Sequence, residues 1–458
     1  MTTSNSLEVM NPHDGKIIAQ TWLADGELLE KSIVAAQNAQ HAMKNLPSWK
    51  KFEILSQISN AITEKREYLA TVLCRESGKP MRYSLSEIDR AAQTFLVAAE
   101  ESKRLPKEYI SLDWTPAGDK KEGFVKYFPI GIVAGIAPFN FPLNLAVHKI
   151  APAIAAGCPI ILKPASSTPL STLELARIID ETDLPKGAVS ILPMNRATGN
   201  QLVTDERFAL LSFTGSPDIG WEMKKNAGKK KIVLELGGNA GVIVSKSADI
   251  ELALKKCIVG AFAYSGQVCI HAQRFFVHTS IFKLFLQRFS EITLALKRGN
   301  PEDITTDVGV MIDEENAQRV EQWVNEAVKS GAKIVCGGKR ENSFYQPTIL
   351  TGTNSTMKVC SEEIFGPVVT VEAYDDFTDA ILRINDTKFG LQAGVFTNDL
   401  SESEIAFNEI QTGGVIINDV PTFRVDHMPY GGIKDSGLGR EGVKYAIMDM
   451  LEAKILVK

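Results

Sequence analysis

Short apolar segments that alternate with helix-sized segments place the strongest constraint on the fold. Between residues 125 and 236, stretches rich in Val, Ile and Leu recur along the chain. The strand candidates are 125–137, 159–162, 189–192, 210–213 and 232–236, and the helix candidates are 143–156, 170–180 and 217–226. Alternation of this kind predicts an α/β fold, in which a parallel sheet has helices on both faces. Ligands of such sheets bind at the carboxyl ends of the strands.

A second alternating series runs from about residue 240 to residue 418. Its strand candidates are 242–244, 274–277, 368–371, 394–396 and 414–417, and its helix candidates are 250–263, 280–297, 313–330, 376–385 and 400–409. The chain has 458 residues, which exceeds one ordinary hydrophobic core. The second series therefore predicts a second α/β domain.

The remaining segments flank these two series. Residues 7–22 predict two short strands, and three helices are expected at 27–45, 49–77 and 82–104 from apolar residues at three- and four-residue spacing. Residues 106–125 are polar and rich in turn formers, which is typical of an excursion from a domain. The tail at 451–458 is a strand candidate that pairs either with this excursion or with another subunit.

Composition excludes several classes of function. The formal net charge of −5 argues against nucleic acid as the main partner, and no apolar run reaches the ~20 residues that span a bilayer. The six cysteines form no CxxC pair and the six histidines have no ligand spacing, so neither a metal site nor a disulfide framework is expected. With a short polar start in place of a signal peptide, we expect a cytoplasmic protein.

Cys269 is the first candidate for chemistry. It follows Gly266 and Gln267, and a glycine turn holds a thiol where it is accessible. A thiolate is the best side-chain nucleophile near neutral pH, so one placed cysteine suits covalent catalysis. Taken alone, Cys269 is more often a small buried hydrophobe.

Four other residues follow strand candidates and invite a chemical interpretation. Glu235 ends an apolar strand before two glycines, where partial burial raises a carboxyl pKa towards the range of a general base. Ser216 lies in a strand–glycine–helix stretch that suits phosphate, Lys163 ends another strand, and Asn140 offers an amide donor. Each of these residues also has an ordinary structural interpretation when it is considered alone.

Seven motifs in one order carry a family resemblance. They are Pro138-Phe-Asn-Phe-Pro142, Lys163-Pro-Ala-Ser166, Phe213-Thr-Gly-Ser216, Glu235-Leu-Gly-Gly238, Gly266-Gln-Val-Cys269, Glu362-Glu-Ile-Phe-Gly-Pro367, and Pro429-Tyr-Gly-Gly432 with Ser436-Gly-Leu-Gly-Arg440. Over nearly its whole length the chain resembles the NAD(P)-dependent aldehyde dehydrogenase superfamily, and most of all lactaldehyde-type dehydrogenases.

The resemblance implies a domain organisation. A Rossmann-like cofactor-binding domain is expected at 1–107 and 131–237, and a catalytic domain at 238–439. A small β oligomerisation element is expected at 108–130 and 440–458, which implies a homodimer or a homotetramer.

The resemblance also implies the reaction, oxidation of an aldehyde to a carboxylic acid with NAD or NADP. Cys269 is expected to be the nucleophile, Asn140 an oxyanion donor, Glu235 the base that activates water, and Lys149 a supporting residue. Glu235 favours hydrolysis over transfer of the acyl group to coenzyme A. The implied cofactor-binding residues are Pro138, Phe139, Lys163, Ser166, Gly215, Ser216, Glu363 and Phe365. Ser166 stands where NAD-selective relatives often have glutamate, so NADP is expected to be accepted.

The substrate is less constrained. The implied pocket residues are Leu145, His148, Val268, Ile270, Phe423 and Arg424. A short polar or hydroxylated aldehyde such as lactaldehyde is expected, with a succinate-semialdehyde type of enzyme or a non-catalytic family member as alternatives. A cysteine hydrolase that pairs Cys269 with His271 is a rival from another class, although the two-residue spacing makes this a poor pair.

Overall fold

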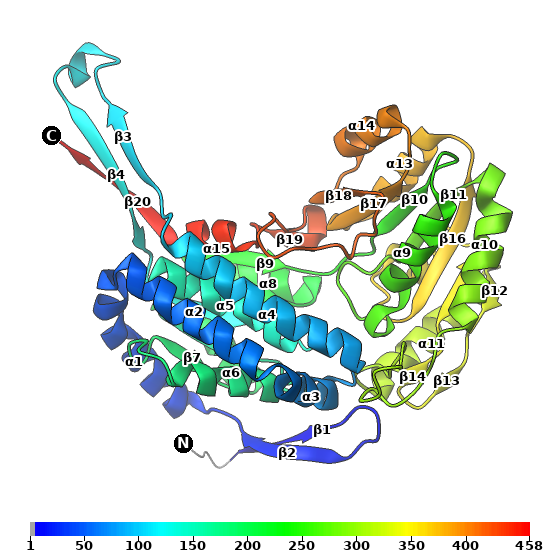
Figure 1. The fold of residues 1–458 in the computed structure, drawn as a ribbon, viewed down its shortest axis with the longest axis horizontal. Helices are drawn as coiled ribbons and strands as arrows, with labels where there is room; N and C mark the ends of the chain where they lie inside the picture. The colour runs from blue at the N-terminus through cyan, green and yellow to red at the C-terminus, as the bar shows by residue number, and fades with distance from the viewer. Residues whose placement is uncertain (1–4) are drawn as a thin grey trace.

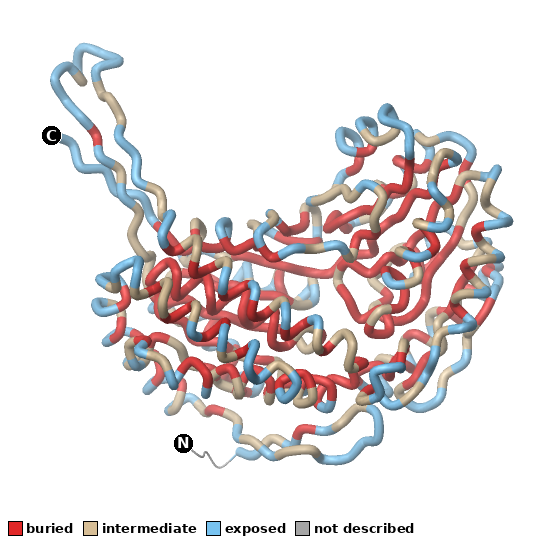
Figure 2. The backbone as a smooth tube through the Cα atoms, in the orientation of Figure 1, coloured by how far each residue is buried: buried red, intermediate tan, exposed pale blue. Residues whose placement is uncertain are grey.

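The computed structural model describes residues 5–458 as two α/β bodies and a projecting arm. The first body contains the blue and cyan helices, the second is green to orange, and the arm carries the carboxyl terminus (Figure 1). Buried backbone runs through both bodies, whereas the arm is mostly exposed (Figure 2). The chain has the α/β fold that the alternation predicts.

The first body is built around a six-stranded sheet. Its order is β19-β9-β8-β5-β6-β7, with β5 to β9 parallel and β19 antiparallel. The strands are β5 (Ile132–Ile136), β6 (Ile160–Lys163), β7 (Val189–Ile191), β8 (Phe208–Thr214), β9 (Lys231–Glu235) and β19 (Gly437–Leu438). The strand order reverses between β5 and β8, and the carboxyl ends of strands at such a switch point form a ligand crevice.

Helices cover this sheet. They are α1 (Gly26–Asn45), α2 (Ser48–Glu64), α3 (Arg66–Ser77), α4 (Met81–Ser102), α5 (Pro142–Ala156), α6 (Leu170–Asp180), α7 (Arg196–Thr204), α8 (Pro217–Asn226) and α15 (Val443–Asp449). The prediction of one helix over 49–77 is wrong, because Lys65 (φ −95°, ψ 17°) separates α2 from α3. The two short strands predicted over 7–22 are confirmed as β1 (Ser6–Met10) and β2 (Ile17–Trp22), which pair antiparallel.

The second body contains a seven-stranded sheet of order β12-β15-β16-β11-β10-β17-β18. Its strands are β10 (Gly241–Val244), β11 (Arg274–His278), β12 (Lys333–Cys336), β15 (Thr348–Thr351), β16 (Val368–Tyr374), β17 (Gln392–Phe396) and β18 (Gly414–Ile417). Its helices are α9 (Ile250–Phe262), α10 (Thr279–Leu294), α11 (Glu314–Lys329), α12 (Lys358–Ser361), α13 (Phe377–Asn385) and α14 (Leu400–Glu409). The sequence reading missed β12, β15 and the small hairpin β13 (Arg340–Glu341) with β14 (Phe344–Tyr345), as well as α12.

The arm is a three-stranded antiparallel sheet of β3 (Lys107–Ser111), β4 (Glu122–Pro129) and β20 (Leu451–Val457). The C-terminal strand β20 pairs with β4 of the same chain. Of the two pairings expected for this tail, pairing with the excursion is therefore confirmed. The prediction of a single strand over 125–137 is wrong, because Gly131 (φ 134°) lies in a break between β4 in the arm and β5 in the first sheet. Within residues 5–458, no helix is long and apolar enough to cross a membrane.

Candidate active site

A cavity of about 500 Å³ lies where the first sheet faces the second body. The segments that follow β5, β8 and β9 form one side of it, and Cys269, Glu363 and residues of α11 form the other. Ten of the predicted site residues line it: Pro138, Phe139, Asn140, Leu145, Gly215, Ser216, Glu235, Cys269, Glu363 and Phe365. The cavity therefore brings together segments that are far apart in the sequence.

The turn before Cys269 explains how its thiol reaches the cavity. Tyr264 and Ser265 adopt left-handed φ angles of 47° and 52°, and Gly266 follows with φ 68°. A Cβ on Gly266 would lie 2.2 Å from the Gly366 carbonyl oxygen, so only glycine fits there. Cys269 is partly exposed, whereas the other five cysteines are buried. The strained turn thus presents one accessible thiol.

Cys269 has a partner that the sequence reading did not identify. Its Sγ lies 3.1 Å from the Tyr430 hydroxyl. Burial raises the pKa of the Cys269 thiol to about 11, and the hydrogen bond with Tyr430 opposes that rise. The resting protein therefore holds a protonated thiol whose position Tyr430 fixes.

The side-chain amide of Asn140 has a fixed orientation. The residue is buried, and its Nδ2 donates a hydrogen bond of 3.0 Å to the Gln267 carbonyl. A primary amide has two N–H groups, so this bond fixes the orientation of the side chain and leaves the second N–H for another acceptor.

Glu235 ends β9 as a buried carboxyl group, 3% exposed. Neither of its carboxylate oxygens has a hydrogen-bond partner within residues 5–458. Burial raises the pKa of Glu235 well above its usual value, and the negative charge of Glu441 raises it further. An unpartnered buried carboxyl group is costly to a fold, and a raised pKa is what a general base near neutral pH requires.

Lys149 lies behind the cavity instead of lining it. Its Nζ donates to Thr214 Oγ1 at 2.7 Å and forms an ion pair of 3.2 Å with Glu441. Glu441 also pairs with Arg424 at 2.9 Å. Burial alone would raise the pKa of Glu441, but the charges of Lys149 and Arg424 outweigh it and lower that pKa to about 2. Glu441 is therefore a fixed anion beside Glu235.

A buried polar network continues from Arg424. Its guanidinium lies 3.7 Å from the centre of the Tyr430 ring and 3.4 Å from His148 Nδ1. Asp426 accepts from His148 Nε2 at 2.8 Å and pairs with Arg90 at 2.7 Å. The Nε atoms of both arginines are buried without a hydrogen-bond partner in the described part of the chain. Three cations in this network therefore share two carboxylates, and two N–H donors remain unused.

The apolar residues that flank Cys269 form a small cluster. Val268 and Ile270 are buried with Leu391 and Tyr430, and Cys269 packs against them. Phe423 is 44% exposed. The predicted substrate residues are thus divided among the cavity lining (Leu145), the polar network (His148 and Arg424), the apolar cluster and the surface.

A second cavity of about 810 Å³ lies beside the first-sheet strands β6 and β8, and Lys163 and Ser166 line it together with Arg196. The Gly215 N–H donates to the Glu235 carbonyl at 3.0 Å, so this amide is already occupied. Ser216 precedes α8 and its side chain makes no capping bond, which leaves the start of this ten-residue helix open to an anion.

On the side of the first cavity that the second body forms, the Glu363 side chain reaches towards the segment that follows β9. Its Oε1 accepts a hydrogen bond of 3.0 Å from the Gly238 N–H, and burial raises its pKa to about 7. A Cβ on Gly237 would lie 2.2 Å from Glu363 Oε2, so the glycine makes room for this carboxyl group. The Phe365 ring meets the Phe139 ring edge-on at 5.8 Å. These residues form a cradle that fits a dinucleotide running from the second cavity into the first.

Several residues of the site were not predicted from the sequence, among them Arg90, Arg319, Trp323, Asp426, Tyr430 and Glu441. Tyr430 stands inside the motif Pro429-Tyr-Gly-Gly432, and Glu441 directly follows the motif that ends at Arg440. These two positions carried a usable signal. Arg90 and Asp426 are 336 positions apart, and no local pattern connects them.

His271 does not support the cysteine hydrolase. Its Nε2 lies 2.8 Å from the Ala261 carbonyl oxygen, and burial lowers its pKa to about 4. The imidazole is therefore engaged with the backbone and is neutral at pH 7.

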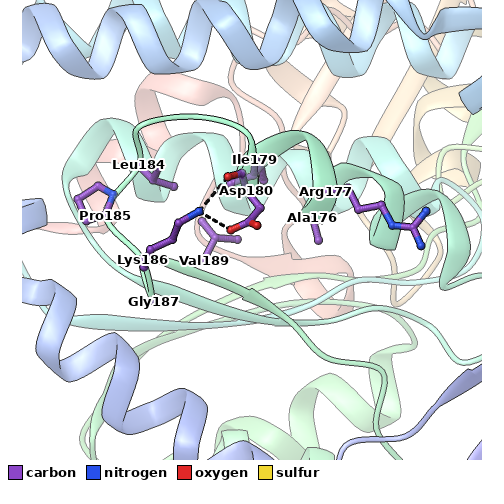
Figure 3. A pocket seen from close by; sticks show the side chains of 9 residues that line it. All are labelled: Ala176, Arg177, Ile179, Asp180, Leu184, Pro185, Lys186, Gly187 and Val189. Atoms are coloured by element: carbon purple, nitrogen blue, oxygen red, sulfur yellow. Dashed lines mark hydrogen bonds and ion pairs between the residues drawn. The ribbon is translucent and has the colours of Figure 1, made fainter. Parts of the chain in front are cut away.

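A further cavity of about 340 Å³ lies between α6 and β7 (Figure 3). Lys186 and Asp180, which form an ion pair of 2.6 Å, lie in its wall. None of the predicted site residues lines it.

Comparison with known proteins decides the family. The sequence profile of the aldehyde dehydrogenase family matches residues 1–456. The chain belongs to the aldehyde dehydrogenase family. It is an NAD(P)-dependent enzyme that oxidises aldehydes, as the motifs predict. The family prediction and the predicted fold are both confirmed.

Three relatives show how close the similarity is. The 3-sulfolactaldehyde dehydrogenase of Priestia aryabhattai is 43% identical over 458 residues, covering 100% of this chain and 95% of the relative. The crystal structure of aldehyde dehydrogenase 21 from Physcomitrella patens, in complex with the reaction product succinate, is 44% identical with a TM-score of 0.99, covering 100% of this chain and 96% of that one. The glyceraldehyde-3-phosphate dehydrogenase of Methanocaldococcus jannaschii, complexed with NADP, is 39% identical with a TM-score of 0.95, covering 99% of this chain and 98% of that one.

Proposed function

We propose that this aldehyde dehydrogenase oxidises a short aldehyde that carries an anionic group, and releases the acid by hydrolysis. The observation that carries the proposal is the pair of arginines Arg90 and Arg424, whose buried Nε donors are unused. The Arg424 guanidinium is itself buried and lies against Tyr430, hence near Cys269, whereas the Arg90 side chain is 27% exposed. An aldehyde with a carboxylate, sulfonate or phosphate group would satisfy these donors and balance the surplus positive charge.

In the proposed mechanism, the Cys269 thiol loses its proton to solvent and Sγ adds to the aldehyde carbon, while the C=O π electrons move to the oxygen and give a thiohemiacetal oxyanion. The Asn140 amide and the Cys269 backbone N–H hold the oxygen that becomes negative. NAD(P), when bound, would supply the acceptor for the hydride that leaves the thiohemiacetal carbon. Loss of that hydride would leave a thioester on Cys269. Glu235 then takes a proton from water, which attacks the thioester carbon and releases the acid and the thiol. Lys149 acts through Glu441, because its ammonium group contacts that carboxylate and Thr214.

The relatives support an anionic substrate. The names of the three relatives point to a sulfonate, a carboxylate product and a phosphate, and each of these groups is an anion. The main alternative substrate is a short hydroxylated aldehyde without an anionic group. Lactaldehyde, for example, offers only a hydroxyl to the same pocket.

A substrate panel tests the proposal. We expect kcat/KM for succinate semialdehyde and 3-sulfolactaldehyde to exceed that for lactaldehyde and hexanal. Arg90→Gln removes one guanidinium and should lower kcat/KM for the anionic aldehydes about tenfold to a hundredfold, with little change for hexanal. Arg66→Gln, which removes a surface arginine paired with Asp89, is the matched control. An equal fall for hexanal, or no fall for the anionic aldehydes, would show that Arg90 does not bind substrate.

We also propose that the enzyme accepts NADP. Ser166 and Lys163 line the second cavity, and no carboxylate is among the residues that line it except Glu222. Arg196, 85% exposed at its side chain, has its nearest carboxylate in Glu222 at 3.9 Å and can turn to a 2′-phosphate. Calorimetry should show tighter binding of 2′,5′-ADP than of 5′-AMP, and Ser166→Glu should reverse that order by charge repulsion.

The arm supports assembly into a homodimer or homotetramer. Tyr109, Phe124, Ile455, Leu456 and Val457 expose 40–59% of their surface on its strands. Such an exposed apolar surface is typical of an interface. Light scattering after size exclusion should give a mass above 50.1 kDa, and Ile455→Asp should lower it.

The six free cysteines support a location in a reducing compartment such as the cytoplasm.

A further inference from the structure

A cavity of about 660 Å³ lies at the base of the arm and shares no lining residue with the cavity that contains Cys269. Its walls come from the α1–α2 junction, the end of α4 and the strands β3 and β4. Five lysines line it, namely Lys44, Lys51, Lys103, Lys107 and Lys126, and no aspartate or glutamate does. The cavity is therefore a concentrated positive surface in a chain whose net charge is −5.

The strand register extends this charge onto the arm. Lys107 lies directly opposite Lys126 on β3 and β4, and Lys126 lies directly opposite Lys454 on β4 and β20. Three lysines therefore stand side by side on one face of the sheet. Like charges directly opposite one another destabilise a sheet unless something compensates them.

Carboxylates of the chain do not compensate these lysines. Within residues 5–458, Lys44, Lys107, Lys126 and Lys454 form no ion pair, since no carboxylate oxygen lies within 4.0 Å of their Nζ. On the same face, Glu452 pairs with Lys231 at 2.7 Å and Glu122 accepts from the Tyr109 hydroxyl at 3.1 Å. Lys103, by contrast, pairs with Glu100 at 3.2 Å.

The ring of Phe128 holds three of the ammonium groups together. The Nζ atoms of Lys44, Lys126 and Lys454 lie 5.4, 5.2 and 5.7 Å from its centre. Attraction to an aromatic face offsets part of the repulsion among cations but adds no negative charge. The cluster therefore keeps its capacity to bind an anion.

Lys51 gives the cavity a buried cationic side chain with hydrogen-bond donors to spare. It is 5% exposed, and its Nζ donates to the Ala155 carbonyl at 3.0 Å. An ammonium group has three N–H donors, so a single carbonyl leaves others unused. Burial lowers the pKa of Lys51 to about 8, and an anion in the cavity would oppose that effect. The start of α2 adds to the same wall, because no side chain caps this 17-residue helix.

We propose that this cavity, which we call the arm-base site, binds a small anion with two or more charges, of the phosphoryl or pyrophosphoryl class. Five lysines, one of them buried, suit an anion that is compact and multiply charged. The site lies where the arm joins the first body, so its occupant links β3 and β4 to α2 and α4.

The test uses the full chain saturated with NADP, so that the cofactor site cannot take up the probe. Pyrophosphate is titrated by calorimetry, with inorganic phosphate as the smaller probe and sodium chloride at matched ionic strength. The double variant Lys44→Gln/Lys126→Gln removes two exposed ammonium groups, and the control variant Lys246→Gln/Lys283→Gln removes two exposed lysines of the second body. We expect saturable pyrophosphate binding that weakens about tenfold or more in the first variant and is unchanged in the control.

Lysine acetylation followed by mass spectrometry locates the bound anion. Pyrophosphate should protect Lys44, Lys107 and Lys126 but not Lys246. Absence of saturable binding, or equal binding by both double variants, would overturn the proposal. Protection of the same lysines without any anion, rising with protein concentration, would identify a second copy of the chain as the occupant and would also overturn it.

Discussion

Glu441 offers a demanding test of how the buried charges hold the site together. In the Glu441→Gln variant, Lys149 and Arg424 lose the carboxylate that they share. Their side chains are only 0% and 6% exposed, so water cannot replace it. Breaking a buried ion pair from one side costs about 3–5 kcal/mol, because the remaining charge stays buried without a partner. We therefore expect a loss of at least about 3 kcal/mol in the free energy of unfolding at pH 7.

Linkage between charge and folding gives a similar magnitude. The pKa of Glu441 is about 2 in the folded protein against an ordinary value of 4.5. A carboxyl group whose pKa is lower in the folded chain stabilises the fold at pH values above its pKa in the unfolded chain. That stabilisation is lost as the pH falls towards the pKa in the folded chain. A difference of this size corresponds to about 3 kcal/mol at neutral pH. The stabilisation should be complete at pH 7 and should disappear between about pH 4.5 and pH 2.

The measurement is urea denaturation at pH 7 followed by tryptophan fluorescence. Glu452→Gln is the matched control, since Glu452 is 62% exposed in its pair with Lys231 and should contribute less than about 1 kcal/mol. The negative charge of Glu441 also raises the pKa of Glu235, so Glu441→Gln should move the pH profile of thioester hydrolysis to lower pH. Equal stability of Glu441→Gln and wild type would refute the argument that this anion is the necessary partner of both cations.

Three further predictions concern the catalytic residues. Glu235→Gln should slow thioester hydrolysis about 10²–10⁴-fold, and acylated Cys269 should accumulate in the mass spectrum, whereas rapid turnover without an acyl-enzyme would contradict the assignment of the base. Tyr430→Phe removes the hydroxyl that lies 3.1 Å from Sγ and should slow alkylation of Cys269 by iodoacetamide about threefold to tenfold, because the hydrogen bond lowers the thiol pKa; an unchanged rate would count against this contact. Gly266→Ala places a Cβ 2.2 Å from the Gly366 carbonyl oxygen at φ 68° and should cost at least about 2 kcal/mol, which thermal denaturation would detect as a lower midpoint.

Local patterns were sufficient for most regular elements. The alternation of strands and helices correctly located β6 to β9 and β10, β11, β16, β17 and β18, because buried parallel strands are short apolar runs. It merged β5 with the end of β4. Periodicity could not show the break at Lys65, since apolar spacing continues through it. It also missed β12, whose burial is slight until its last residue, Cys336. The domain boundaries and the roles of the site residues stay predictions.

The sequence by itself determined the candidate chemistry. Asn140 and Glu235 follow or end strands of the first sheet, and the topology of a parallel sheet brings such positions together. Cys269 stands on a glycine turn of the second body, and packing of the two bodies brings it to the same cavity. Only the tertiary structure decided the electrostatics around them. Tyr430 beside the thiol, Glu441 between two cations, and Arg90 paired with Asp426 across 336 residues all depend on long-range packing. The physical reason is that pKa values and ion pairs follow burial and distance, which only the folded chain determines.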